Sequence, residues 1–203
     1  MTSIISGALF GLSVIVLDGL TQKYDHQRVL YRVESLMGCI TFLTLIMTVF
    51  TLNNVPALYG ILGLFFGGQF CAAVMDAKDM KVADIYHIWS FIPLIPLIIL
   101  FFLSGLSFWN IVLFIILQIV FRLFGAYADS DVIAFVLMGL LIYSLGGTIL
   151  LMIGTQLVSY ILLFIPEMIG KNVNRAGNLK TVKPFIPYIF LSETIALCVV
   201  MFL

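Results

Sequence analysis

The feature that most constrains this chain is a succession of long apolar runs, separated by short breaks that carry charges or turn residues. A helix needs roughly 20 mainly apolar residues to cross a bilayer. Eight runs of about this length are predicted, at residues 3–20, 36–53, 55–75, 87–104, 107–124, 132–154, 155–170 and 184–203. With 63% hydrophobic and only 10% charged residues, the chain lies outside the range of soluble globular proteins. We therefore predict an all-α, polytopic membrane protein with about eight transmembrane helices, forming one domain over residues 1–203.

The basic residues predict how the runs are oriented, because Lys and Arg concentrate in the short cytoplasmic loops of membrane proteins. All ten lie in or at the breaks that follow the first, third, fifth and seventh runs, Arg122 at the end of the fifth run: Lys23, Arg28, Arg32, Lys78, Lys81, Arg122, Lys171, Arg175, Lys180 and Lys183. This asymmetry predicts a multi-pass protein of the cell membrane, with both termini outside and the odd-numbered loops in the cytoplasm.

Charge and cysteine content argue against several classes of partner. The formal net charge is zero, so no global field would attract a nucleic acid. The three cysteines, Cys39, Cys71 and Cys198, are isolated within apolar runs and form no Cys-x-x-Cys pair. We predict no metal site, no cofactor and no nucleic-acid partner, and a lipid bilayer as the surroundings.

Two acidic segments leave apolar runs on the same predicted face of the membrane, Asp76–Asp84 after the third run and Arg122–Asp131 after the fifth. Two carboxyl groups that share a proton have their ionisations pushed apart, which leaves one as a general base for water and the other as a general acid. Asp76 and Asp129 are the candidate pair. The small residues Gly125 and Ala128 would let a substrate backbone approach closely.

A structural interpretation of the same residues is also open. Aspartate is a common N-cap, so Asp129 or Asp131 could cap the sixth run, and Asp76 with Lys78 could belong to a solvated loop. Asp131 could raise the pKa of Asp129 by like-charge repulsion, or face away from it. Spacing alone does not show that two aspartates meet.

Three motifs in this chain resemble those of the type IV prepilin peptidases, a family of membrane aspartyl proteases. Asp76, five residues and Val82-Ala83-Asp84 resemble the family's Asp, five residues and Ile-Pro-Asn or Ile-Pro-Asp. Ala126-Tyr127-Ala128-Asp129 resembles Gly-x-Gly-Asp, and Pro184-Phe185-Ile186-Pro187-Tyr188 resembles Pro-Phe-x-Pro-Phe. The motifs occur in family order, from about residue 56 to the end of the chain.

The resemblance implies an endopeptidase that removes the basic leader from pilin-like precursors at the cytoplasmic face, without a cofactor. It implies catalytic roles for Asp76 and Asp129. The supporting or substrate-binding positions are Gly125, Ala128, Asp131, Lys78 and Pro184. Alanines replace the family's proline and glycines, and Asp131 replaces a lysine. The family's N-terminal insertion with paired Cys-x-x-Cys motifs is missing, so we expect peptidase activity without methyltransferase activity.

Two other functions compete with this interpretation. Asp18, Glu193 and the loop aspartates could bind or relay ions in a small transporter or channel, because carboxyl groups inside a membrane are costly and often functional. Glu193, near the middle of the last run, could instead be a protonated hydrogen-bonding group between helices. The departures from the family motifs are also consistent with an inactive scaffold of a pilus or secretion assembly.

Overall fold

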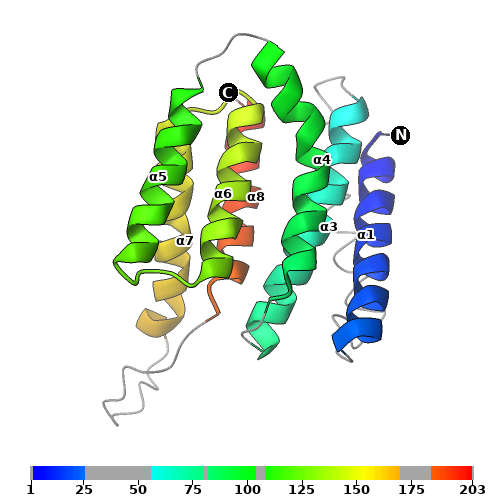
Figure 1. Ribbon diagram of the computed structural model, residues 1–203, viewed down its shortest axis with the longest axis horizontal. Helices are drawn as coiled ribbons and strands as arrows, with labels where there is room; N and C mark the ends of the chain where they lie inside the picture. The colour runs from blue at the N-terminus through cyan, green and yellow to red at the C-terminus, as the bar shows by residue number, and fades with distance from the viewer. Residues whose placement is uncertain (1, 26–55, 80–81, 104–107, 170–183, 203) are drawn as a thin grey trace. The chain divides into compact units, whose positions relative to one another are not determined.

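The computed structural model describes residues 2–25, 56–79, 82–103, 108–169 and 184–202. All regular structure in these ranges is helical, which confirms the all-α class. The helices are α1 (Thr2–Asp25), α3 (Pro56–Asp79), α4 (Asp84–Leu103), α5 (Trp109–Leu123), α6 (Asp129–Ser144), α7 (Ile149–Ile169) and α8 (Ile186–Phe202) (Figure 1). The run predicted at 36–53 lies outside the described residues.

Among the described residues, two helices are long and apolar enough to cross a membrane by length and composition, over Ile5–Lys23 in α1 and Gly60–Lys78 in α3. Four further apolar helical stretches in the described residues are shorter than these two: Asp84–Leu100, Trp109–Leu123, Ile149–Phe164 and Ile186–Leu197. The prediction of eight transmembrane helices therefore stays a prediction.

The chain forms two compact units. The first comprises Met1–Met75 with Val82–Leu106, and it contains α1, α4 and α3 as far as Met75. The second comprises Asp76–Lys81 with Ser107–Leu203, so it contains the last turn of α3 together with α5, α6, α7 and α8. Asp76 and both acidic residues at the start of α6 thus belong to the second unit.

In the first unit, glycines on α3 allow its neighbours to approach its backbone. A side chain at Gly63 would collide with the backbone of Ser6 on α1, and one at Gly68 would collide with Ser90 on α4. The Ser90 hydroxyl donates a hydrogen bond across to the Phe65 carbonyl of α3, at 3.2 Å. Small residues at helix contacts are the usual means by which membrane helices pack closely.

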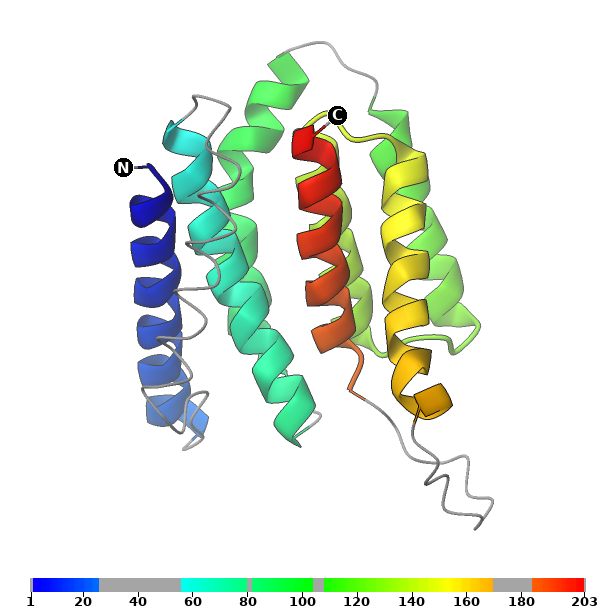
Figure 2. The same cartoon turned by 180° about the vertical axis from the view of Figure 1, so that it is seen from behind.

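The second unit is a bundle of four helices that run alternately up and down (Figures 1 and 2). α5 packs along α6 and α7 along α8, while α6 also contacts both α7 and α8. α5 lies close to α6 at Gly139, where a Cβ added to the glycine would be 2.6 Å from the Phe114 ring. α6 and α8 begin at the end of the bundle where α5 and α7 finish, so their N-terminal turns share that end.

A glycine ends α5 just before the predicted second motif. Gly125 has a φ of +74°, in the left-handed region that favours glycine. Its N–H donates to the Arg122 carbonyl at 2.8 Å, and the Ala126 N–H donates to the Phe121 carbonyl at 3.0 Å. This pair of hydrogen bonds is the Schellman motif, which satisfies carbonyls that the helix end leaves without partners.

The same motif ends α6 and corrects one predicted boundary. Gly146 has a φ of +85°, and the N–H groups of Gly146 and Gly147 donate to the carbonyls of Tyr143 and Ile142. The helix therefore ends at Ser144 and the next begins at Ile149. The predicted boundary between residues 154 and 155 was wrong, because hydropathy continues through a glycine turn that carries no charge.

Candidate active site

Asp76 lies one turn before the end of α3, and its side chain is only 7% exposed. One carboxylate oxygen accepts a hydrogen bond from the Ile186 N–H at 2.9 Å, and the Phe185 N–H also bonds to this carboxylate. Ile186 is the first residue of α8. The N–H groups of a helix's first turn have no partner within the helix, and the helix dipole favours an anion there. The segment that resembles the third motif therefore holds Asp76.

Asp131 closes the N-terminus of α6. Ala128 is in an extended conformation just before the helix, and its N–H donates to an Asp131 carboxylate oxygen at 3.1 Å. A side chain that reaches back in this way forms one half of a capping box. Asp131 is also buried, with 9% of its surface exposed. Asp131 thus has part of the N-capping role that the sequence left open.

The electrostatic surroundings of Asp131 connect it to Asp76. Burial raises the pKa of Asp131 to about 6, the hydrogen bond from Ala128 lowers it, and the negative charge of Asp76 raises it. A neighbouring charge perturbs a carboxyl group in this way only when it lies close by. The charge of Asp76 therefore reaches Asp131, which lies at the end of the bundle where α6 and α8 begin (Figures 1 and 2).

Asp129 has different surroundings. Its side chain is 70% exposed and forms an ion pair with Arg122 of α5, whose own side chain is 47% exposed. The hydrogen bond from the Arg122 guanidinium keeps the pKa of Asp129 below its usual range. The structure thus gives Asp129 a partner at the surface, whereas Asp131 is buried.

An aromatic cluster lies beside the two buried carboxyl groups. Phe185, which binds Asp76 through its N–H, packs with ring centroids 5.1 Å from Tyr160, 5.5 Å from Phe135 and 6.1 Å from Tyr127. Tyr127 belongs to the segment that resembles the second motif, and Phe185 belongs to the third. The cluster therefore joins these two segments, and neither residue was predicted as part of the site.

A buried polar network fixes Tyr127 from the other side. Its hydroxyl is hydrogen-bonded to the Gln156 amide and to Tyr160. Gln156 and Gln118 exchange two amide hydrogen bonds, of 3.1 and 3.2 Å, which link α7 to α5. Burial raises the pKa of Tyr127, so the phenol stays neutral near pH 7. Glutamines inside apolar runs were the sequence signal that could have indicated this network.

The remaining predicted site residues have simpler environments. Gly125 forms the turn that ends α5, and a Cβ built on it would contact nothing within 4 Å. Ala128 is exposed and contributes its backbone N–H. Lys78 is half-buried in the last turn of α3, and Pro184 is half-buried two residues before α8. The structure thus assigns backbone roles to Gly125 and Ala128.

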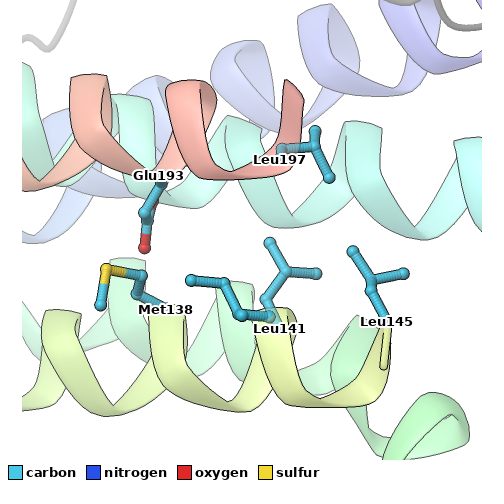
Figure 3. Close-up of a pocket in the computed structure, with 6 residues that line it drawn as sticks. Met138, Leu141, Leu145, Glu193 and Leu197 are labelled. Carbon is cyan, nitrogen blue, oxygen red and sulfur yellow. The ribbon is translucent and has the colours of Figure 1, made fainter. Parts of the chain in front are cut away.

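Glu193 is a buried carboxyl group away from this site. It projects from α8 toward α6, into a crevice lined by Met138, Leu141, Ile142, Leu145 and Leu197 (Figure 3). The residue is 1% exposed, and neither carboxyl oxygen has a hydrogen-bond partner among the residues that the structure describes. The crevice has no room for a water molecule. Glu193 therefore lies in an apolar contact between two helices.

Within the described ranges, no three His, Cys, Asp or Glu side chains gather as a metal ion would require. What the acidic site offers is a pair of buried carboxyl groups, held by backbone N–H donors and flanked by aromatic rings. No protein-family model, no curated protein and no solved structure matches this chain.

Proposed function

We propose that this protein is an integral membrane aspartyl endopeptidase that cleaves the basic leader from pilin-like precursors. The observation that carries the proposal is the convergence of the three motif-like segments. The carboxylate of Asp76 binds the N–H groups of Phe185 and Ile186, and Tyr127 packs on Phe185. Segments that lie 110 residues apart in the chain thus meet around one carboxylate, as a shared catalytic task would require.

The membrane location is supported by the surfaces of the helices. Beside the two long apolar helices, the outward faces of α4 and α7 expose large apolar side chains, among them Ile92, Ile99, Leu103, Leu157, Ile161 and Phe164. Water-soluble monomers rarely expose apolar surface on this scale, whereas lipid covers it. The placement of both termini outside and of the acidic site toward the cytoplasm follows from the distribution of basic residues.

Hydrolysis by two carboxyl groups needs one ionised side chain, one protonated side chain and a water molecule. The carboxylate takes a proton from the water, whose oxygen bonds to the peptide carbonyl carbon while the protonated carboxyl gives its proton to the carbonyl oxygen. The C–N bond then breaks as the first carboxyl passes its proton to the nitrogen and the second recovers one from the diol. One water is consumed, and both side chains return to their starting forms.

The substrate class agrees with a site at the end of a helical bundle. In pilin-like precursors a hydrophobic helix follows the cleavage point, so a precursor would enter from the lipid while its basic leader stays in the cytoplasm. The exposed apolar faces of the helices would accept such a neighbour. The activity proposed is endopeptidase activity alone, without methylation of the new N-terminus.

The proposal is tested by following cleavage of several co-expressed pilin-like precursors by the intact chain, by Asp76→Asn and by the control Asp18→Asn. Loss of a general acid or base typically costs about 10²- to 10⁴-fold in rate. We expect the Asp76 variant to insert in the membrane and to lose cleavage to this extent, while the control cleaves normally.

Undiminished cleavage by Asp76→Asn would contradict the mechanism. A failure of the intact chain to cleave any precursor would contradict the peptidase function, and would favour the scaffold or the transporter. Loss of cleavage in Asp18→Asn to the same degree would also count against a site that is confined to the acidic end of the second unit.

A further inference from the structure

The two aspartates at the start of α6 point in different directions. Successive residues of an α-helix are rotated by about 100°, so residues two apart differ by roughly 200°. Asp129 and Asp131 therefore project from nearly opposite sides of the first turn. Their exposure is consistent with this geometry, because Asp131 is buried whereas the Asp129 side chain is 70% exposed. At most one of them can face Asp76.

Packing around α6 shows which side faces Asp76. Phe135 lies one turn after Asp131, so the two side chains share a face of the helix. The Phe135 ring packs edge-on against Phe185, with centroids 5.5 Å apart. Phe185 and Ile186 are the two residues whose N–H groups bind Asp76. The face of α6 that carries Asp131 therefore lies against the segment that holds the Asp76 carboxylate.

Asp129 is held by a different element. Its carboxylate bonds to Arg122, which lies in the last turn of α5. This pair closes the connection between α5 and α6 at the surface. Both members stay charged, since each stabilises the ionised form of the other. A carboxylate neutralised by a guanidinium would be a poor partner with which Asp76 could share a proton.

We propose that Asp131, and not Asp129, is the second carboxyl group of the hydrolytic pair, acting with Asp76. This assignment rests on the proposed peptidase function and replaces one residue of the pair that motif matching selects. The role of Asp129 is then structural, as the exposed partner of Arg122.

The charges around Asp131 also indicate how the two roles divide. The titratable groups that act on it are Asp76 from α3, Tyr127 from the segment before α6, and Tyr160 from α7. Tyr127 is neutral near pH 7, so Asp76 is the anion that acts on this site. Burial raises the pKa of Asp131 to about 6, so below that pH Asp131 carries a proton and can serve as the acid, whereas the Ile186 N–H at the start of α8 favours the ionised form of Asp76. Asp76 is then the base.

The test compares Asp131→Asn with Asp129→Asn in the full-length chain, with Asp76→Asn as the reference for complete loss. Asparagine keeps an oxygen that can accept the Ala128 N–H, so the helix cap survives the change. We expect Asp131→Asn to lose about 10²- to 10⁴-fold in cleavage rate, as Asp76→Asn does, and Asp129→Asn to stay within about tenfold of the parent. Membrane insertion and elution as a single species in detergent serve as the control for folding.

The outcomes separate this assignment from the function itself. If Asp76→Asn and Asp129→Asn are inactive while Asp131→Asn cleaves normally, the assignment is overturned and the peptidase function stands. If Asp76→Asn cleaves normally, the function fails. If Asp131→Asn does not accumulate, Asp131→Glu is tested in its place. Glutamate keeps the carboxyl group but moves it, so a catalytic role at this position predicts slower cleavage with a changed pH dependence. An unchanged rate and pH dependence in that variant would overturn the assignment.

Discussion

Buried carboxyl groups occur in two regions of the second unit, and their surroundings differ. At the end of the bundle, Asp76 accepts the Ile186 N–H and Asp131 accepts the Ala128 N–H. In the middle of α8, Glu193 is equally buried but lies among Met138 and leucines, with no hydrogen-bond partner in the described part of the chain. Burial alone therefore does not indicate chemistry. Donors that can hold an anion distinguish the acidic end from the middle of the bundle.

The largest expected difference between the two regions is in cleavage rate. Asp76→Asn should lower the initial rate of precursor cleavage by about 10²- to 10⁴-fold, because the base for water is lost. Glu193→Gln has nearly the same shape and should change the rate by less than about threefold, since the residue lies in an apolar helix contact. Rates are compared on purified protein in detergent. A comparable loss of rate in Glu193→Gln would contradict this distinction, because it would show that Glu193 in the middle of the bundle takes part in cleavage.

The second difference is in pH dependence, and it should belong to the acidic end. The pKa of Asp131 is raised to about 6, so Asp131 is protonated at low pH and loses its proton as the pH rises through that value. Cleavage that needs this proton should fall by about tenfold per pH unit above the pKa. The cleavage rate is measured from about pH 4.5 to about pH 8.5. Glu193→Gln should keep the same profile, and a flat profile in the parent would argue against Asp131 as the acid.

The third difference concerns packing in the middle of the bundle. A Cβ at Gly139 would lie 2.6 Å from the Phe114 ring, so Gly139→Leu should force α5 and α6 apart. The expected loss is about 1–3 kcal/mol of the free energy of unfolding, measured by thermal or denaturant unfolding in detergent. Gly154→Leu on α7 is the matched control, because a Cβ there would meet nothing within 4 Å. Equal loss in both variants would show that the close crossing at Gly139 is not the cause.

The smallest effect is expected at the glycine turns. Gly125 and Gly146 both have positive φ and open space around them, so Gly→Ala at either should cost only backbone strain, about 1–2 kcal/mol. Gly125 leads directly into α6 and its acidic first turn, so Gly125→Ala should also slow cleavage several-fold, whereas Gly146→Ala should not. Unfolding and cleavage are measured on both variants. Slower cleavage only in Gly146→Ala would contradict the placement of the site.

Much of the helical structure could be predicted from local sequence. The runs predicted at 3–20, 87–104 and 107–124 correspond to α1, α4 and α5, because a long apolar run between polar breaks has few other ways to satisfy its backbone. The boundary between α6 and α7 was wrong because it is set by Gly146, whose signal is conformational. Hydropathy does not detect such a turn when no charge accompanies it.

The candidate site was predictable in part. Motif order singled out Asp76 and the segment around Phe185, and these two do meet. Motif matching also selected Asp129, for which the structure records the partner Arg122. The aromatic contact of Tyr127 with Phe185 was not predicted, because it depends on how α6, α7 and α8 pack together.

By itself, then, the sequence determined the all-helical class, the approximate positions of α1, α4 and α5, and that acidic residues follow the third and fifth runs. These properties depend on residues near one another in the chain. The tertiary structure decided that Asp131 is buried while Asp129 pairs with Arg122 at the surface, and that Glu193 lies in an apolar contact. That choice depends on the rotation of each helix about its axis and on its neighbours, and packing between distant segments sets both.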